Sequence, residues 1–299
     1  MSESNDSGFS FQDNRKIDLY CKENNIKTVV QLGDLFDRRK YISFQTLDLC
    51  RKYFFDELYR QDMELHALLG NHDITYKNTL EVNSPELLLT EYTNVHIYNE
   101  PVSWQGIDII PWICRDNEKE INEFISKSNN QICFGHFEIA GFEMDRGNVC
   151  HEGMDAELLR RYELVLSGHF HHKSSQGNIT YVGTPSEHTW ADYNDTRGFH
   201  ILDTDTRELT FIENPFRMFY KVNYNEDVMT YGSITGTDFS HLANKYVKIV
   251  VEKRENSFLF DTLLDSIAVH SPIELSVVED FTDYGESDVE IDVDQAEDT

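Results

Sequence analysis

The sequence has few basic residues and no long apolar run, and each of these deficits argues against a class of protein. Its 26 Lys and Arg residues are outnumbered by 54 Asp and Glu, so the formal net charge is −28. This balance argues against a protein that binds nucleic acid through electrostatic attraction alone. No apolar run reaches the roughly 18 residues that a membrane-spanning helix needs. The N-terminus, MSESNDSGFSFQDN, lacks the basic flank and apolar core of a secretory signal.

Cysteine is also sparse, and it does not occur in the pairs that bind zinc or in the numbers that form a disulfide framework. The chain has five cysteines, an odd number, and no CxxC pair. These observations predict reduced thiols in a cytoplasmic protein.

Acidic residues gather at the C-terminal end of the chain. Residues 279–298 contain ten acidic residues and no Lys or Arg, so this segment alone carries a charge of −10. Alternating acids of this kind are typical of a disordered or partner-dependent segment. We therefore predict an acidic disordered tail over residues 281–299.

Helix-like and strand-like periods alternate through the first two thirds of the chain. Helical spacing covers residues 14–24, 43–60, 117–128 and 155–161, with apolar strand-like runs between most of these segments. This alternation predicts a layered α/β domain over residues 1–214. The predicted strands are residues 27–32, 63–69, 95–98, 107–110, 132–134, 164–166 and 179–182, followed by a hairpin over residues 198–214.

A second, smaller domain is predicted beyond the hairpin. The runs MFYKVNY, YVKIVVEK and PIELSVVED are strand-like, and an apolar helical pattern lies near residues 258–267. This combination predicts a small α+β domain over residues 215–280, with its boundary near Asn214 and Pro215.

The same pattern follows four of the predicted strands in the first domain. A glycine ends each apolar run, and residues able to bind a metal ion come directly after it. Sheets of α/β proteins place their sites at the carboxyl ends of the strands, so we expect these residues to meet. The motifs are Gly33-Asp34-Leu35-Phe36-Asp37, Gly70-Asn71-His72-Asp73, Gly135-His136 and Gly168-His169-Phe170-His171.

The residue types in these motifs indicate a metal site for phosphate chemistry. Asp, Asn and His offer oxygen and imidazole nitrogen but no thiolate, which suits Mn²⁺, Fe or Zn²⁺. Asp34 can bridge two ions, and the neutral amide of Asn71 leaves the site electropositive. Such ions bind phosphoryl oxygens and generate hydroxide at neutral pH. On an extended strand, His169 and His171 would point to the same face.

The catalytic residues predicted from the second motif are His72 and Asp73. His72 follows a predicted metal ligand and is therefore expected beside bound phosphate, as a transition-state stabiliser or proton donor. Asp73 would orient its imidazole. Each motif alone is weak, because a single His after Gly is more often an ordinary loop residue. The four motifs in this order, each after an apolar strand, are specific.

The ordered motifs resemble those of the calcineurin-like metallophosphoesterase superfamily. GDLFDRR, LLGNHD, GHFEIAGF, LSGHFHH and YVGTP look most like the SbcD-type nuclease subunits of double-strand-break repair, in particular those of T-even-type phages. The resemblance spans residues 9–294. It implies a four-layer αββα sandwich, two Mn²⁺ ions and a small α+β capping domain that helps to select DNA ends.

The resemblance also implies a role for each motif residue. Asp34 would bridge the two metals, whereas Asn71, His136 and His169 would complete one site and His171 would belong to the other. The histidine of the GNHD motif would be catalytic. The implied activity is Mn-dependent double-strand exonuclease and single-strand endonuclease. The implied partners are DNA and an SbcC-type ATPase in the cytoplasm, that of the host if a phage encodes the chain.

The chain departs from the family pattern at both ends. The family opens with a strand ending in Asp-x-His, which supplies ligands to one metal, and no such motif precedes Asp34. The nearest substitutes, Asp6 and Asp13, have no His two residues on. We therefore expect an incomplete second site with Asp34 and His171 alone. The helices that dock on the ATPase in the family are also missing. A chain that is short at both ends is expected from a fragmentary gene, from a gene that has been split, or from a misplaced start.

Three functions remain open from the sequence: a DNA phosphodiesterase of repair or recombination, a small-molecule phosphoesterase, and a catalytically impaired scaffold. The predicted capping domain favours DNA, and the missing Asp-x-His motivates the scaffold. Arg38 and Arg39 lie close to Asp37 and are candidate contacts for a DNA phosphate. The net charge predicts weak, salt-dependent DNA binding unless the ATPase partner or a homodimer assists.

Overall fold

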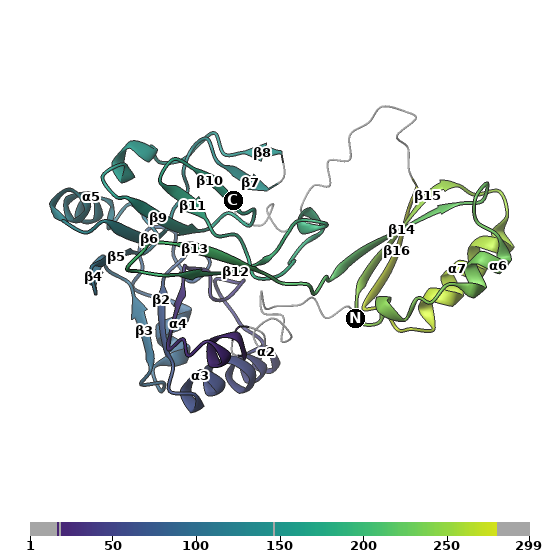
Figure 1. Cartoon of the computed structure of the whole chain (residues 1–299), viewed down its shortest axis with the longest axis horizontal. Helices are drawn as coiled ribbons and strands as arrows, with labels where there is room; N and C mark the ends of the chain where they lie inside the picture. Colours follow the sequence, from purple (N-terminus) through teal and green to yellow (C-terminus); the bar gives the residue numbers. More distant parts are fainter. Residues whose placement is uncertain (1–16, 18, 146, 280–299) are drawn as a thin grey trace. The chain divides into compact units, whose positions relative to one another are not determined.

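The structure, a computed structural model, describes residues 17, 19–145 and 147–279 and divides into two compact units. The first unit ends at Phe216 and the second begins at Arg217. Figure 1 follows both units along the chain by colour. The acidic tail predicted over residues 281–299 lies outside the described residues, as do the two candidate aspartates near the N-terminus.

Two sheets form the centre of the first unit. The smaller sheet contains, in spatial order, the parallel strands β1 (Thr28–Gln31), β2 (Glu64–Leu68) and β3 (Val95–Tyr98). The larger sheet contains, in spatial order, β10 (Ser174–Gln176), β11 (Ile179–Tyr181), β9 (Leu164–Gly168), β6 (Ile132–His136), β5 (Ile107–Ile110) and β4 (Val102–Trp104). Its four inner strands are parallel, and an antiparallel strand lies at each edge.

Helices cover the outer face of each sheet, so the first unit has four layers. Beside the smaller sheet lie α2 (Phe44–Cys50), the π-helical segment η1 (Arg51–Phe55), α3 (Asp56–Arg60) and α4 (Ser84–Leu89). Beside the larger sheet lie α5 (Glu118–Lys127) and the 3₁₀ segment η2 (Ala156–Leu159). This arrangement confirms the predicted αββα sandwich.

The side-chain pattern of β2 explains how the layers pack. Leu65 and Ala67 face the helical layer and join a core with Leu58 of α3. Leu68 points the other way and packs between the sheets against Phe134 and other residues of the larger sheet. Because successive side chains of a strand point to opposite faces, one short strand contributes to two cores.

The predicted hairpin is present as β12 (Gly198–Leu202) and β13 (Leu209–Glu213), which pair antiparallel. Short elements that the sequence pattern does not reveal are β7 (Glu143–Asp145), β8 (Asn148–Val149) and the 3₁₀ segment η3 (Trp190–Asp192).

The second unit is a parallel three-stranded sheet with its own core. Its strands are β14 (Phe219–Asn225), β15 (Tyr246–Lys253) and β16 (Glu274–Glu279), in that spatial order. Its helical elements are α6 (Tyr231–Gly236), the 3₁₀ segment η4 (Ser240–Leu242) and α7 (Ser257–Ala268). Alternate residues of β15, namely Val247, Ile249 and Val251, pack against apolar residues of α7 such as Leu263 and Ile267.

Two further expectations concern membrane segments and cysteines. None of the helices in the described part of the chain has the length and apolar character needed to span a membrane. All five cysteines are buried as free thiols.

Candidate metal centre

The four glycine-containing motifs converge where β1, β2, β6 and β9 end. Ligand atoms of Asp34, His136 and His169 all lie within 4.8 Å of one another. The amide oxygen of Asn71 belongs to the same cluster, 2.9 Å from Nε2 of His136 and 3.0 Å from Nδ1 of His169. The structure thus brings together the four residues predicted for one metal site.

The loop after β1 is shaped by its own side chains and by an unusual backbone. The side-chain amide of Gln31 accepts from the Gly33 N–H at 3.0 Å and donates to the Gly33 carbonyl at 2.5 Å. Gly33 and Asp34 both adopt positive φ, 90° and 57°. A non-glycine residue in this region costs about 1–3 kcal/mol and persists where its surroundings enforce it, as at functional sites.

The tautomer of His136 follows from its hydrogen bonds. Its ring is buried, and Nδ1 lies 2.7 Å from the carbonyl oxygen of Leu32. A carbonyl only accepts, so Nδ1 must carry the proton and donate. In the neutral ring, Nε2 therefore presents its lone pair to the cluster. Such a bond from the second ring nitrogen is how metal-binding histidines are usually oriented.

His169 is placed by a strained backbone just beyond β9. Its φ is 85°, and its Nδ1 lies 3.2 Å from Nε2 of His136. Burial, together with the neighbouring His136, lowers the pKa of His169 to about 3. The ring is therefore neutral at pH 7, which is the form that binds a metal ion.

The cluster is rich in electron pairs and poor in protons, which is the chemical signature of a cation site. Nε2 of His136 faces the amide oxygen of Asn71 and, at 3.2 Å, a carboxylate oxygen of Asp34. Burial alone would raise the pKa of Asp34, but the charges and hydrogen bonds of His136 and His72 together outweigh it and keep that pKa well below the usual value. Burial alone would lower the pKa of His136, but Asp34, together with the hydrogen bond to Leu32 and the charge of Asp73, raises it. A divalent ion can replace the shared proton, so the donor set fits a metal.

Comparison with known families agrees with this geometry. A family described as calcineurin-like phosphoesterase matches residues 5–173, more than half of the chain. The chain belongs to the calcineurin-like phosphoesterase family. Members of this metallophosphoesterase family use divalent metal ions, which is what the cluster of Asp34, Asn71, His136 and His169 is suited to bind.

Relatives of this phosphoesterase include two components of nucleases. Exonuclease subunit 1 of Enterobacteria phage T4 is 37% identical over 267 residues, which cover 87% of this chain and 77% of that protein. The SbcD component of the nuclease SbcCD of Staphylococcus epidermidis is 23% identical over 218 residues, which cover 60% of this chain and 56% of that protein. A solved structure described as a novel archaeal phosphodiesterase matches 68% of this chain and 92% of its own, with 14% identity and a TM-score of 0.36.

His72 lies at the rim of the phosphoesterase cluster. Its backbone N–H donates to a carboxylate oxygen of Asp34 at 2.8 Å, and its Nδ1 lies 2.6 Å from the carbonyl oxygen of Asp37. Because that carbonyl can only accept, Nδ1 carries a proton and Nε2 is the nitrogen that remains for a substrate. The side chain is half-buried, so a ligand at the cluster could reach it.

The role predicted for Asp73 is corrected by its hydrogen bonds. The carboxylate is fully buried and accepts from four backbone N–H groups, at 2.8–3.3 Å. Two bonds to each oxygen use the lone pairs that could otherwise hold an imidazole. The Nδ1 of His72 is instead oriented by Asp37. Burial, reinforced by the charge of Asp34, raises the pKa of Asp73, and the N–H bonds oppose this shift. The donors are the N–H groups of Asp34, Leu35, Phe36 and Gly70.

His171 does not join the cluster in this structure. β9 ends at Gly168, so the extended geometry that would point His169 and His171 to one face is missing. The Nδ1 of His171 lies 3.8 Å from a carboxylate oxygen of buried Asp192, and its ring is 5.7 Å from that of His188. A role for His171 in a second metal site stays a prediction.

Arg38 and Arg39 lie in the loop that follows Asp37. The guanidinium of Arg38 bonds to the hydroxyl of Tyr41 and lies 5.2 Å from the centre of that ring. Contact of either arginine with a DNA phosphate stays a prediction.

Sequence reasoning missed Trp112, which borders the metal cluster. Its ring centre lies 5.2 Å from that of His169 and 5.8 Å from that of His136. Its backbone N–H donates to the carbonyl of Leu69 at 2.7 Å, which ties the loop after β5 to the end of β2. Its position gave a usable signal, because Trp112 follows an apolar strand as the predicted ligands do. It was overlooked because tryptophan does not bind metal ions.

Gly70 is predicted to be indispensable to the site. A Cβ there would lie 2.1 Å from a carboxylate oxygen of Asp34 and 2.3 Å from its nitrogen. Gly70→Ala should therefore lower metal affinity at least tenfold and destabilise the fold by about 1–3 kcal/mol. Calorimetric Mn²⁺ titration and urea unfolding would measure both effects. Gly232→Ala is the control, because a Cβ at Gly232 meets nothing within 4 Å; equal behaviour of the two variants would contradict the prediction.

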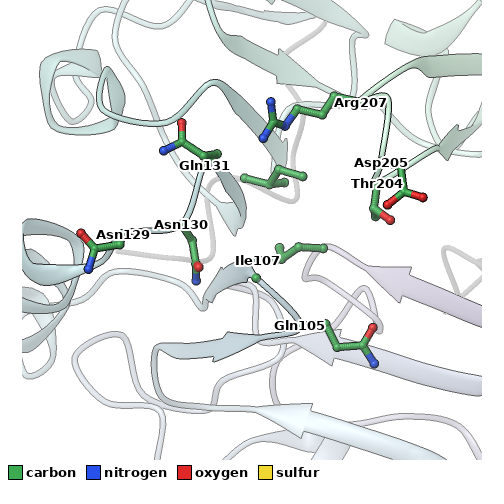
Figure 2. A pocket seen from close by; sticks show the side chains of 10 residues that line it. Gln105, Ile107, Asn129, Asn130, Gln131, Thr204, Asp205 and Arg207 are labelled. Atoms are coloured by element: carbon green, nitrogen blue, oxygen red, sulfur yellow. The ribbon is translucent and has the colours of Figure 1, made fainter.

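A polar hollow of about 270 Å³ lies away from the metal cluster. Figure 2 shows residues that line it, among them Gln105, Asn130 and Arg207. It opens where β5 and β6 begin, whereas His136 lies where β6 ends. Arg207, one of its lining residues, is paired with Glu163. The hollow therefore lies at the end of the sheet where these strands begin, opposite the end that carries the candidate centre.

Proposed function

We propose that this chain is the nuclease subunit of a DNA repair or recombination complex, acting as a Mn²⁺-dependent DNA phosphodiesterase with an SbcC-type ATPase as partner. The observation that carries the proposal is the cluster of Asp34, Asn71, His136 and His169 at the strand ends of a phosphoesterase fold. The similarity to exonuclease subunit 1 and to the SbcD component of the nuclease SbcCD supports DNA as the substrate.

The chain's own residues would bind and orient the reacting groups. A bound divalent metal would neutralise phosphoryl charge and supply hydroxide at neutral pH. Asp34, Asn71, His136 and His169 would hold it, with the carbonyl of Leu32 fixing the ring of His136. When its ring carries a proton on both nitrogens, His72 would donate from Nε2 to a phosphoryl oxygen or to the leaving oxygen.

The proposed role of the second unit, which corresponds to the domain predicted over residues 215–280, is to cap the site and help select DNA ends. This unit has a hydrophobic core of its own, which supports its interpretation as a separate module added to the phosphoesterase domain. The net charge of −28 opposes tight binding to DNA by this chain alone. The ATPase partner, or a second copy of the chain, would then supply much of the DNA affinity.

Hydrolysis of a labelled linear duplex, with and without Mn²⁺, tests the proposed function. We expect Mn²⁺-dependent cleavage that rises when the ATPase is added and that His136→Ala abolishes. His151→Ala, which changes an exposed histidine outside the cluster, should leave cleavage unchanged. Hydrolysis of a small phosphomonoester without cleavage of DNA would instead indicate a small-molecule phosphoesterase. Metal binding without hydrolysis of either substrate would indicate an impaired scaffold.

A further inference from the structure

A second cluster of metal-binding side chains lies at the start of β2 and β3. Ligand atoms of Glu64, His66 and His96 all lie within 4.8 Å of one another. Among the described residues, this cluster and the one at Asp34 are the two groups of three or more such side chains that are close enough to share an ion. Nothing in the proposed phosphodiester chemistry uses it.

The register of the smaller sheet creates this cluster. Glu64 and His66 are two residues apart on β2, so their side chains lie on the same face. His66 pairs directly with His96 in the parallel ladder between β2 and β3. Their rings stack with centres 4.7 Å apart and planes inclined by 20°. Three side chains from two strands are thereby fixed in one place by backbone pairing.

His66 has a buried nitrogen that points at the cluster and lacks a hydrogen bond. The residue is 2% exposed, and its Nδ1 lies 2.7 Å from the hydroxyl of Tyr98. Its Nε2 is buried and makes no hydrogen bond within the described part of the chain. A carboxylate oxygen of Glu64 lies 3.5 Å from this nitrogen, which exceeds the length of a charge-assisted bond. Leaving a buried polar atom unsatisfied costs about 1–3 kcal/mol.

The protonation state favours a metal ligand over an ion pair. Burial, with a contribution from nearby His96, lowers the pKa of His66, although Glu64 opposes this shift. The Tyr98 hydroxyl can accept from Nδ1, and in the neutral tautomer that makes this bond Nε2 presents its lone pair to the cluster. This resembles His136, where a hydrogen bond from Nδ1 also leaves Nε2 facing the ligands.

We propose that Glu64, His66 and His96 form an accessory site for a transition-metal ion of the Zn²⁺, Ni²⁺ or Cu²⁺ type. Two imidazoles and one carboxylate are a ligand set that such ions prefer, and metal–ligand distances of about 2.0–2.2 Å are within reach of these donors. Glu64 is exposed and can move toward the ion. The ring of His96, on an edge strand, would rotate out of its stack to face it.

The accessory site is separate from the candidate centre. His66 lies within β2, whereas Asn71 lies beyond the end of the same strand, five residues on and about 16 Å away along an extended chain. An ion bound by Glu64, His66 and His96 would link β2 to β3 near the start of β2, whereas Asn71 lies beyond the end of that strand. Its expected effect is therefore on stability, with hydrolysis left unchanged.

The alternative is that His66 serves only as a packing residue. Its ring lies 4.0 Å from that of Trp104 and 5.9 Å from that of Tyr98, so it fills space between the two sheets. A packing role explains the burial, but it explains neither the unsatisfied Nε2 nor the exposed carboxylate beside it. The two roles differ in one measurable property, the affinity for Zn²⁺.

Zinc binding by the whole chain distinguishes the two roles. His96→Gln and Glu64→Gln change surface residues and should fold, unlike substitutions of buried His66. We expect the parent to bind one more Zn²⁺ per chain than His96→Gln in equilibrium dialysis, with at least a tenfold loss of affinity at this site in Glu64→Gln. His151→Gln, at an exposed histidine outside the cluster, should bind as the parent does.

A second readout links the ion to the fold and does not depend on hydrolysis. Because an ion that binds only the folded chain stabilises it, Zn²⁺ should raise the unfolding temperature of the parent more than that of His96→Gln. Mn²⁺-dependent hydrolysis should be equal in both. Equal zinc stoichiometry and equal thermal shifts in the parent and His96→Gln would overturn the proposal and leave His66 as a packing residue.

Discussion

Replacement of His72 by Ala is expected to lower the turnover of Mn²⁺-dependent phosphodiester hydrolysis by about 10²–10⁴-fold, with little change in metal affinity. The two effects separate because different atoms of the residue produce them. The imidazole is the part that would meet substrate. The backbone N–H, which alanine retains, is the part that bonds to Asp34 at 2.8 Å.

The geometry also predicts the behaviour of a more conservative variant. Nδ1 donates to the carbonyl of Asp37 and so directs Nε2 away from the loop. In His72→Asn, the shorter amide can still reach that carbonyl but cannot extend to the position of Nε2. We therefore expect His72→Asn to be about as inactive as His72→Ala.

Steady-state hydrolysis of a labelled duplex would measure the loss of turnover, and Mn²⁺ calorimetry would measure metal binding in the same preparations. The control is His151→Ala, an exposed histidine outside the cluster that should behave as the parent does. Unchanged turnover in His72→Ala would remove this residue from catalysis. A parallel loss of metal affinity would indicate a role in binding the metal.

The sequence predicts the candidate site well where each ligand follows a regular strand. Asp34, Asn71 and His136 come directly after or at the end of apolar runs, and parallel pairing brings the ends of such runs to one edge. Their convergence therefore follows from local patterns together with one rule of sheet topology. The same regularity explains why the four-layer fold was predictable.

The prediction for His171 depended on a backbone conformation that the sequence does not reveal. Two histidines two residues apart share a face only if the strand continues, and β9 stops at Gly168. His169 then adopts a φ of 85°, which turns its ring toward the other ligands. Positive φ in a residue other than glycine is imposed by tertiary contacts, so it is invisible to pattern reasoning.

The role of Asp73 was unpredictable for a similar reason. A carboxylate beside a histidine suggests an orienting partner, yet its four hydrogen bonds go to backbone groups, three of them about 38 residues away in sequence. Those N–H groups belong to the turn after β1, which has no regular secondary structure to satisfy them. Only the folded arrangement of the two loops shows that they require an acceptor.

Replacement of Asp73 by Ala is therefore expected to have the largest effect on stability of any single change in the site, a loss of at least about 3 kcal/mol. The change leaves four buried backbone N–H groups without their acceptor. These bonds connect the turn containing Asp34 to the turn containing Asn71. Metal affinity should fall together with stability, because the bonds set the positions of two ligands.

Asp73→Asn provides the sharper comparison because it keeps the size and shape of the side chain. Each carboxylate oxygen of Asp73 accepts two N–H bonds, so either orientation of the amide places an NH₂ group against two donors. We expect a lower urea midpoint and a stability loss of about 2 kcal/mol or more. Asp205→Asn, at an exposed position, should leave the midpoint unchanged. A midpoint for Asp73→Asn equal to that of the parent would show that the N–H groups find other acceptors and that Asp73 does not hold the two loops together.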